Sequence, residues 1–340
     1  MSKNFRLGLV GCGRISKNHF EAISQVDGID LVAVADVVPE RANSVGVAHG
    51  VPAFASLKSM LDGVACDIIT IATPSGLHPA LGVEAATAGK HVVTEKPMAI
   101  SLEGADSLIA ACAENGVRLF VVKQNRLNPA IQLVKRAVEK GRFGRIHSAN
   151  CTVRWARPQE YYDQAPWRGT WAMDGGAFMN QASHYVDLIQ WLAGPVESVA
   201  AITATQERKI EAEDSGAAVL RFRNGAIGVL DVTMLTYPKN LEGSITILGD
   251  RGSVKIAGTA VNRVETWLFE DYDDDDKLID AAATTPPNVY GFGHQGYYSN
   301  VVRLLRGEAV PDTNGEEGRK SLEIILAIYE SSRTGRAVKL

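Results

Sequence analysis

The sequence predicts an α/β protein in which an N-terminal doubly wound parallel sheet is followed by an α+β domain with an open, mostly antiparallel sheet. Three observations carry this prediction. Apolar strand patterns alternate with helical patterns up to residue 122, as in parallel strands joined by helices. After Lys123 the strands follow one another through hairpin turns, which is typical of antiparallel pairing. The length of 340 residues allows two domains, which we expect at residues 1–122 and 123–340.

In the first domain, each expected strand is a short apolar run and each expected helix has apolar residues three and four positions apart. Strands are expected at residues 5–10, 31–35, 67–72, 91–94 and 118–122. Helices are expected at residues 17–26, 39–49, 77–88 and 101–115, the last with Ser101 as its N-cap. This alternation predicts a sheet with helices on both faces.

The second domain is expected to begin with a helix at 129–141 and to end with helices at 295–305 and 315–332. Between them, strands are expected at residues 146–156, 199–205, 217–222, 226–235 and 244–248. Asn224-Gly225 and Asp250-Arg251-Gly252 are expected to be hairpin turns. The acidic run 270–276 lacks the glycine and terminal glutamate of a Ca²⁺-binding loop, so we expect a solvated loop there. Residues 281–288 contain two prolines and are expected to form a linker.

The composition excludes several classes of protein. Hydrophobic residues make up 46% of the chain and charged residues 22%, as in ordinary globular proteins. The first apolar run stops at Gly11, too early for a secretory signal or a membrane span, so we expect a cytoplasmic protein. The four cysteines show no CxxC spacing, so we expect buried, reduced thiols, with no structural metal site and no disulfide framework.

A glycine-rich turn, Gly11-Cys12-Gly13-Arg14-Ile15-Ser16, follows the first expected strand. The two glycines let the backbone turn tightly and approach a pyrophosphate at a helix N-terminus, as in the dinucleotide-binding Rossmann fold. Asp36 ends the next strand, 23 residues after Gly13. A carboxylate there binds ribose hydroxyls and repels a 2′-phosphate, so the sequence predicts NAD rather than NADP. An exposed loop aspartate is the alternative.

Lys96 follows the expected strand at 91–94 and precedes Pro97, which fixes the turn. In open parallel sheets the ligand crevice lies outside the carboxyl ends of the strands, so this lysine can touch a bound ligand. A surface lysine in a strand-to-helix loop is the alternative. His78, four residues after Pro74, is expected beside the nicotinamide half of the cofactor or, equally, as a helix cap.

The stretch 175–193 reads as one helix that is apolar nearly all round and therefore buried. Asn180 and His184 are four residues apart on it and would stack on one face. Buried polar groups need partners, and a core histidine satisfied by its neighbours is the usual explanation. The two adjacent polar side chains, next to Gly175-Gly176, favour a functional site instead.

Positive charge and aromatic residues gather between Arg118 and Arg168, where 11 Lys and Arg face 3 Asp and Glu in a chain of net charge −4. Lys135, Arg136, Lys140 and Arg142 are expected on one exposed helix without a binding role. The rest form a patch that can pair phosphates and stack a base: Lys123, Arg126, Arg154, Arg157 and Arg168, interleaved with Trp155, Tyr161, Tyr162 and Trp167. Nucleic acid is disfavoured by the acidic pI near 6.0, so we expect a small anionic ligand such as a nucleotide sugar.

Five segments together carry a resemblance: GCGRISKNH, TPSGLHP, TEKPM, GGAFMNQASHYVD and the closing AIYESSRTG. In this order they resemble the glucose-fructose oxidoreductase and inositol dehydrogenase family over essentially the whole chain. VVKQNR, RPQEYYD, WRGTW and TYPKNLEGSITILG are further similar to its bacterial members that oxidise the 3-hydroxyl of UDP-N-acetyl-2-amino-2-deoxyglucuronate (UDP-GlcNAcA). The resemblance implies a Rossmann domain, tightly held NAD, a homotetramer and a cis bond before Pro97. It also implies a downstream aminotransferase on a route to diacetamido uronic acids of surface polysaccharide such as O-antigen.

Residue roles follow from the same resemblance. It implies a catalytic Lys96 and His184, with Asn180 at a position where the broad family commonly has an aspartate. The implied cofactor contacts are Gly11, Gly13, Arg14, Ile15, Asp36, Thr73, Pro74, His78, Glu95, Lys96, Gln124, Trp167 and Arg168. The substrate contacts that we expect are Lys96, Arg154, Arg157, Tyr161, Asn180, His184, Lys239 and Asn240. No metal ligand is expected.

Chemistry constrains these roles, because oxidation of a hydroxyl needs a base within about 3 Å of that oxygen. A lysine starts from a pKa near 10.4 and needs a drop of roughly three units, whereas a histidine starts near 6.5. We therefore expect His184 to accept the proton, Lys96 to stabilise the alkoxide and Asn180 to orient the hydroxyls, with a shared role for Lys96 left open.

Two other functions remain possible at this stage. A polyol or simple-sugar dehydrogenase, such as an inositol dehydrogenase, would use the same lysine and histidine without needing the positive aromatic patch. A protein that only senses nicotinamide redox state would lack Lys96 or His184, and both are present. The reduced cofactor either leaves or is recycled in place by an oxidant such as 2-oxoglutarate.

Overall fold

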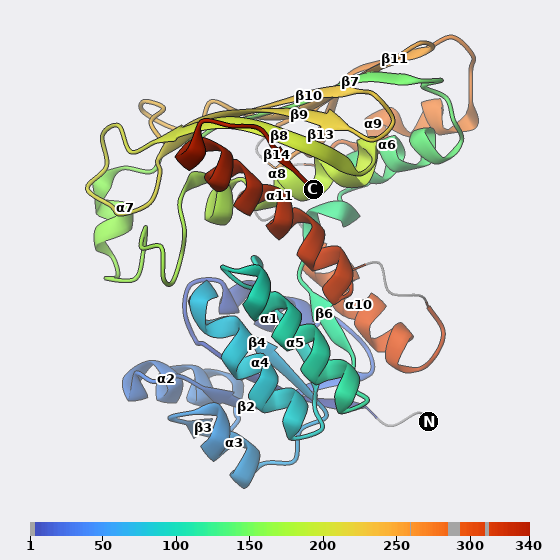
Figure 1. Ribbon diagram of the computed structural model, residues 1–340. Helices are drawn as coiled ribbons and strands as arrows, with labels where there is room; N and C mark the ends of the chain where they lie inside the picture. The colour runs from blue at the N-terminus through green and yellow to red at the C-terminus, as the bar shows by residue number, and fades with distance from the viewer. Residues whose placement is uncertain (1–3, 259, 285–292, 310–312) are drawn as a thin grey trace. The chain divides into compact units, whose positions relative to one another are not determined.

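The computed structural model describes residues 4–258, 260–284, 293–309 and 313–340. The chain divides into two compact units (Figure 1). The first comprises Met1–Val122 with His294–Arg319, and the second comprises Lys123–Gly293 with Lys320–Leu340. The first boundary between the two units therefore falls after residue 122. Residues 294–319 group with the first unit, although the sequence analysis assigned them to the second domain.

The first unit holds a parallel sheet of order β3-β2-β1-β4-β5-β6. Its strands are β1 (Phe5–Val10), β2 (Ile29–Ala35), β3 (Ala53–Phe54), β4 (Ile68–Ile71), β5 (His91–Thr94) and β6 (Leu119–Val121). Every residue of β4 is buried, as expected for a strand covered on both faces. The strand order reverses between β1 and β4, and ligands of such sheets bind at this switch point.

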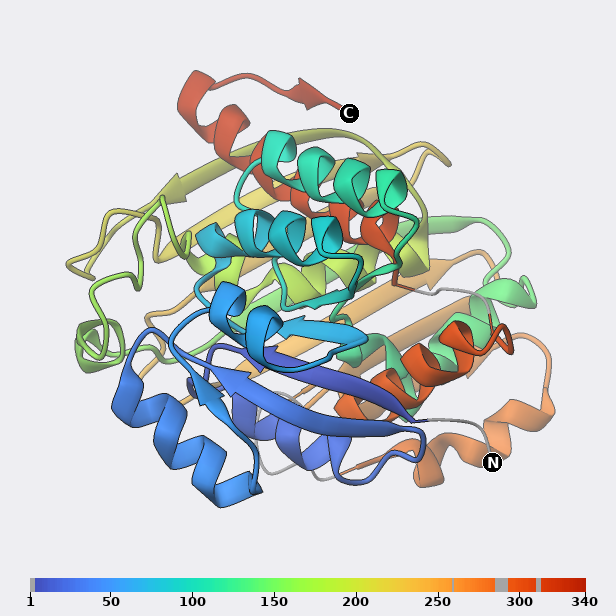
Figure 2. The same cartoon turned by 90° about the horizontal axis from the view of Figure 1, so that it is seen from below.

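Helices lie on both faces of this sheet. In Figure 2 the strands run between α4 and α5 on one side and α1 and α2 on the other. The helices are α1 (Ser16–Ile23), α2 (Pro39–His49), α3 (Leu57–Gly63), the short η1 (Ser75–Leu77), α4 (His78–Thr87), α5 (Leu102–Glu114), α10 (Gly293–Leu305) and the start of α11 (Gly315–Thr334). The predicted cap of α5 is confirmed, because Ser101 Oγ accepts the N–H of Gly104 at 3.1 Å. The two-residue β3 and the short α3 were not predicted.

The second unit is built on a sheet of order β13-β12-β11-β7-β10-β9-β8-β14. Its strands are β7 (Ile146–Arg154), β8 (Val196–Ala204), β9 (Ser215–Phe222), β10 (Ile227–Thr233), β11 (Glu242–Gly249), β12 (Gly252–Ala257), β13 (Arg263–Phe269) and β14 (Val338–Lys339). Among the described strands of this second sheet, only β7 and β10 pair in parallel. The mostly antiparallel sheet and both hairpin turns are thus confirmed, whereas β12 and β13 were not predicted.

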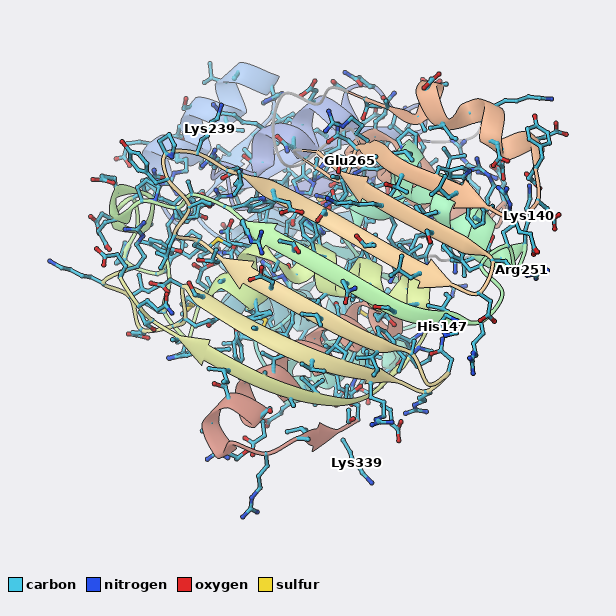
Figure 3. All side chains as sticks on the ribbon, turned by 90° about the horizontal axis from the view of Figure 1, so that it is seen from above. Lys140, His147, Lys239, Arg251, Glu265 and Lys339 are labelled. Carbon is cyan, nitrogen blue, oxygen red and sulfur yellow. The ribbon has the colours of Figure 1, made fainter. Side chains whose placement is uncertain are left out.

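One face of this sheet is covered by helices and the other is open. Buried and less buried residues alternate along β10, so that Gly228, Leu230 and Val232 face the helical layer. Figure 3 shows the open face, with no helix over the strands. The helices of this unit are η2 (Gln124–Leu127), α6 (Pro129–Glu139), α7 (Gln159–Asp163), η3 (Ala177–Gln181), α8 (Ser183–Ala193), η4 (Asp274–Leu278), α9 (Ile279–Ala282) and the rest of α11.

The prediction of a single helix at 175–193 is wrong. Gly175 has a φ of +74°. The π-helix η3 ends at Gln181 and α8 begins at Ser183, so Ala182 separates the two helices. The N–H of Ala182 bonds to the carbonyl of Ala177 at 2.8 Å, five residues back. Because a π-turn is wider than an α-turn, Asn180 on η3 and His184 on α8 are not stacked as i and i+4 of one regular helix.

The acidic run is also not the solvated loop that was expected. The basic residues on and after α6, which were expected to be exposed without a role, pair with it instead: Asp273 with Lys140 at 2.6 Å, Asp275 with Arg136 at 3.1 Å and Asp276 with Arg142 at 2.6 Å. The guanidinium of Arg142 lowers the pKa of Asp276 to about 2. The run was misread because its cationic partners lie far away in the sequence.

Three further expectations concern single features. All four cysteines are buried and free, as predicted, and the Lys96–Pro97 bond is cis. Of the expected linker, residues 281–282 belong to α9 and 285–288 lie outside the described residues. Among the described helices, none combines the length and apolar character that a bilayer-spanning segment needs.

Candidate functional site

The turn after β1 has the backbone geometry of a dinucleotide-binding loop. Gly11 has a φ of +98°, and a Cβ on it would lie 2.6 Å from the carbonyl of Ala72 at the end of β4, so only glycine fits there. A Cβ on Gly13 would meet no atom within 4 Å, which leaves the backbone open to a ligand. Ser16 begins α1 and its Oγ bonds to the carbonyl of Gly13 at 2.7 Å. These residues fit the pyrophosphate of NAD at a helix N-terminus.

Asp36 is joined to this turn. Its Oδ2 accepts the N–H of Cys12 and its Oδ1 accepts the N–H of Val38, both at 2.8 Å. Only 7% of Asp36 is exposed, which excludes the exposed-loop alternative. A carboxylate can accept about four hydrogen bonds, so both oxygens retain capacity for ribose hydroxyls.

Lys96 stands just beyond β5, half-buried, in a turn fixed on both sides. Its backbone N–H donates to Glu95 Oε2 at 3.1 Å. The following carbonyl, of Pro97, lies 2.8 Å from Nδ1 of His78, whose Nε2 lies 2.9 Å from the carbonyl of Thr73. His78 is 1% exposed and burial lowers its pKa. It does not cap α4 but ties the loop after β4 to the loop after β5.

Glu95 is itself held in a buried cluster. His19 Nε2 donates to Glu95 Oε1 at 2.9 Å, His294 Nε2 lies 3.7 Å from the same oxygen, and Tyr298 Oη is 2.7 Å from His19 Nδ1. Burial opposes the charge of Glu95, but the hydrogen bond from His19 and the proximity of His294 outweigh it and hold the pKa of Glu95 well below the usual range. Across the described residues, His19, Glu95 and His294 are the one group close enough to share a metal ion. Hydrogen bonding already accounts for both ring nitrogens of His19.

In the second unit, His184 begins the first turn of α8 and is 7% exposed. Gln124 is a predicted cofactor contact. Its side-chain Nε2 lies 3.1 Å from His184 Nε2. Because an amide N–H can only donate, this contact leaves the lone pair on His184 Nε2, the form that can accept a proton. Gln124 Oε1 has no partner among the described residues.

Asn180 belongs to a polar network that surrounds the turn before His184. Its Nδ2 donates to the buried Asp174, and its Oδ1 accepts from Gln181 Nε2 at 2.9 Å. Gln181 Oε1 in turn accepts from Arg157 Nε at 2.9 Å, while Gln181 Nε2 also reaches Tyr161 Oη at 3.0 Å. The fold therefore brings Asn180 on η3 together with Arg157 and Tyr161 from the segment 157–161.

The same network extends to further predicted residues. Asn240 Oδ1 accepts from Arg157 Nη1 at 3.2 Å and from the N–H of Ala156 at 2.9 Å. Arg168 Nη1 donates to Tyr161 Oη at 2.7 Å, and its guanidinium lies 4.7 Å from the Trp167 ring. Arg157 stacks on Trp155 and Tyr161 at 5.0 and 5.4 Å. This cluster of cations and aromatic rings has the chemistry to pair an anion and stack a base.

Other members of the expected basic patch lie elsewhere. Lys123 and Arg126 are 3% and 2% exposed and bind the buried Asp187, Arg126 through two bonds of 2.7 and 2.8 Å. Their inclusion in a ligand-facing patch is wrong, because both are buried and pair with Asp187. Arg154 alternates with the buried Val153 on β7 and bonds to Asp231 on the open face of the sheet, so the fold does not bring it to the network. Lys239 is exposed at one end of the sheet (Figure 3).

Both parts of the chain match models of one protein family. Residues 5–123 match a family model described as "Oxidoreductase family, NAD-binding Rossmann fold". Residues 135–340 match the model described as "Oxidoreductase family, C-terminal alpha/beta domain". The chain belongs to this oxidoreductase family. The expected family, its Rossmann domain and its NAD cofactor are thereby confirmed.

Within this oxidoreductase family, two solved structures are similar over the whole chain. The WlbA dehydrogenase from Bordetella pertussis, in complex with NADH and UDP-GlcNAcA, is 56% identical, with 100% of this chain and 99% of that chain covered and a TM-score of 0.97. The WlbA enzyme from Chromobacterium violaceum, with the same two ligands, is 52% identical over 100% and 97%, with a TM-score of 0.95. The D-apiose dehydrogenase of Paraburkholderia graminis is 28% identical over 99% of this chain and 90% of its own.

NAD is the cofactor of this oxidoreductase, and the position of Asp36 predicts poor use of NADP. We expect wild-type kcat/KM to favour NAD by about tenfold or more, since juxtaposed like charges cost several kcal/mol. Replacement of Asp36 by serine is expected to shrink this ratio, with steady-state kinetics on both cofactors as the measurement. An unchanged ratio in the variant would show that Asp36 does not select the cofactor.

Four residues near the network were not singled out from the sequence: Asp174, Gln181, Glu213 and Tyr329. Asp174 lies just before Gly175-Gly176, and Gln181 next to Asn180, so both stand in the segment that the motif marks. Glu213 carries no local signal. Tyr329 stands in the closing segment AIYESSRTG, but its contact with η3, like that of Glu213, arises only through the fold. Glu213 is 2% exposed.

Burial raises the pKa of Glu213 to about 7 from an ordinary 4.5, with the neighbouring Asp214 adding to the rise and bonds from Phe178 and Tyr329 opposing it. The folded chain therefore holds this proton more tightly than the unfolded chain, and stability should fall as the pH rises from about 4.5 to about 7. The expected contribution is about 3 kcal/mol at most. Urea unfolding across this range should show a flatter profile for Glu213→Gln than for wild type, and parallel profiles would contradict the assignment.

Proposed function

We propose that this chain oxidises the 3-hydroxyl of UDP-GlcNAcA with NAD to give the 3-keto sugar. The observation that carries the proposal is the similarity, at 56% and 52% identity over the full chain, to two dehydrogenases solved with NADH and UDP-GlcNAcA. The network of Arg157, Tyr161 and Arg168 supports it, because a sugar nucleotide presents a diphosphate and a base, and the uronate adds a carboxylate.

Each catalytic residue has one proposed task. His184 accepts the proton of the 3-hydroxyl at Nε2, where the hydroxyl takes the place of the Gln124 amide. Lys96 stabilises the developing alkoxide, and Asn180, held by Asp174, orients the sugar hydroxyls. NAD supplies the hydride acceptor when it is bound to the first unit. A histidine starts near pKa 6.5 and so can act as a base at neutral pH.

The substrate's charges have proposed partners in the second unit. Arg157 and Arg168 are assigned to the diphosphate or the uronate carboxylate, with Lys239 and Asn240 as further contacts. Trp167, Arg168 and Gln124 remain proposed cofactor contacts as well. Arg154 is the weakest of these assignments, since Asp231 and Glu242 already pair with it at 3.0 and 3.4 Å on the open face of the sheet.

A substrate panel tests the proposal. Protein and NAD are mixed with UDP-GlcNAcA, with the matched UDP-sugar lacking the carboxylate, and with one lacking the N-acetyl group, while NADH fluorescence and product mass are followed. A parallel series contains 2-oxoglutarate, because NADH recycled in place would not accumulate. We expect a product lighter by two hydrogens only when the carboxylate is present. Turnover of free inositol or glucose, with none of UDP-GlcNAcA, would favour a polyol or simple-sugar dehydrogenase.

The product has a defined chemical fate. A 3-keto sugar is a substrate for an aminotransferase, which would install nitrogen at C3 on a route to diacetamido uronic acids. We infer this next step, and its use in surface polysaccharide, from the chemistry of the proposed product.

We also infer a homotetramer in which the open sheet face takes part. Six large apolar residues are exposed on that face: Ile202, Val219, Ile227, Val229, Leu248 and Leu268. Contiguous exposed apolar surface of this kind marks interaction sites. Light scattering should give about four times the 36.5 kDa chain mass, and a monomer would contradict the inference.

A further inference from the structure

The start of η3 is held from outside the helix. The first N–H groups of a helix have no partner within it, and here three in succession are satisfied by distant residues. The N–H of Ala177 bonds to the backbone carbonyl of Glu213 at 2.9 Å. The N–H of Phe178 bonds to Glu213 Oε1 at 2.8 Å, and that of Met179 to Tyr329 Oη at 3.2 Å.

Glu213 and Tyr329 are also joined to each other. The hydroxyl of Tyr329, on α11, donates to Glu213 Oε1 at 2.9 Å while it accepts from Met179. A Cβ at position 176 would overlap Glu213 Oε2, so Gly176 is required for this close approach. The chain around Glu213 is fixed in turn, because the Asp214 carboxylate accepts the N–H groups of Gln206, Glu207 and Arg208.

This cap lies directly before the residues assigned to the substrate. The N–H of Asn180 bonds back to the carbonyl of Gly176 at 3.0 Å, and Gln181 carries the link to Arg157 and Tyr161. π-turns are uncommon and occur frequently at functional sites, where they place a side chain that a regular helix would direct elsewhere. A change in the cap therefore changes where Asn180 and Gln181 stand.

We propose that Glu213 and Tyr329 are positioning residues of the sugar site, which fix the π-turn and through it Asn180 and Gln181. The sugar part of this inference rests on the proposed function, whereas the positioning of the turn does not. Neither residue touches a substrate atom in this proposal. They act by holding the N–H groups of Phe178 and Met179.

The test combines hydrogen exchange with kinetics. In Glu213→Ala we expect the amides of Phe178 and Met179 to lose protection. The KM for UDP-GlcNAcA should rise by about tenfold to hundredfold, as for the loss of two hydrogen bonds, while NAD affinity stays unchanged. Glu213→Gln keeps the Oε1 acceptor and should restore both protection and KM to near wild type.

Tyr329→Phe is the second variant, since it removes a single oxygen and folds even if Glu213→Ala does not. It should expose the amide of Met179 more than that of Ala177. Tyr297→Phe is the control, because Tyr297 is a buried tyrosine of the first unit, and it should leave exchange at 177–179 unchanged.

Protection at 177–179 that survives in both Glu213→Ala and Tyr329→Phe would overturn the proposal. Lost protection with an unchanged KM for UDP-GlcNAcA would overturn the link to the sugar. If wild-type protein does not turn over UDP-GlcNAcA, the proposed function fails, but the exchange result still decides whether the two residues hold the turn.

Discussion

Replacing His184 by asparagine is expected to lower kcat for UDP-GlcNAcA by about 10²–10⁴, the usual contribution of a general base. NAD should still bind, since the glycine turn and Asp36 lie in the first unit, whereas His184 lies in the second. Asparagine keeps a polar group beside Gln124 but cannot accept a proton near neutral pH. Single-turnover NADH formation, together with NAD binding measured by fluorescence, separates the two effects.

The matched control is the same substitution at His147. This histidine is exposed, pairs with Asp250 at 2.5 Å and lies at an end of the open sheet (Figure 3). His147→Asn is expected to leave kcat within about twofold, as is usual for surface substitutions. An unchanged rate in His184→Asn would remove this histidine from the mechanism.

Replacing Asp187 by alanine is expected to cost about 3–5 kcal/mol of unfolding free energy, because it removes the carboxylate that pairs with two buried cations. Burial opposes the charge of Asp187, but Lys123 and Arg126 outweigh it and lower its pKa. Arg126 also lies 4.9 Å from the ring of Trp191 and is 2% exposed, so its guanidinium cannot easily reach water. Urea unfolding followed by tryptophan fluorescence measures the loss.

A surface pair provides the contrast for this second prediction. Lys58 and Asp62 lie 2.7 Å apart with side chains 77% and 67% exposed. Asp62→Ala is expected to change the unfolding free energy by less than about 1 kcal/mol. Equal losses in Asp187→Ala and Asp62→Ala would show that the buried ion group contributes no more than an exposed one.

The first unit could be predicted well because the patterns that specify its strands, its glycine turn and its helix cap lie within short stretches of the sequence. The strands β1, β4 and β5 are short, mostly apolar runs, and Gly11 and Ser101 mark turn and cap by their own chemistry. β3 escaped prediction because two residues give no periodicity. In the second unit, β12 and β13 carry polar side chains on the open face, which diluted their apolar pattern.

The candidate site was predicted in part, and the rest depended on long-range contacts. Lys96, Asn180 and His184 stand in motifs that the sequence displays. The burial of Arg126 depends on Asp187, 61 residues away, and the pairing of Arg154 depends on Asp231, 77 residues away. The break in the expected helix at 175–193 depends on Glu213 and Tyr329, which approach η3 only in the folded chain. No periodicity within the helix could show these partners.

Transfer of a labelled hydride tests the central claim, that the chain removes hydride from C3 of UDP-GlcNAcA. UDP-GlcNAcA carrying deuterium at C3 is incubated with protein and NAD for a single turnover, and the masses of sugar and cofactor are measured. The account predicts that the deuterium leaves the sugar and appears in the reduced cofactor. Deuterium retained in an oxidised sugar would place the reaction at another carbon and contradict the account.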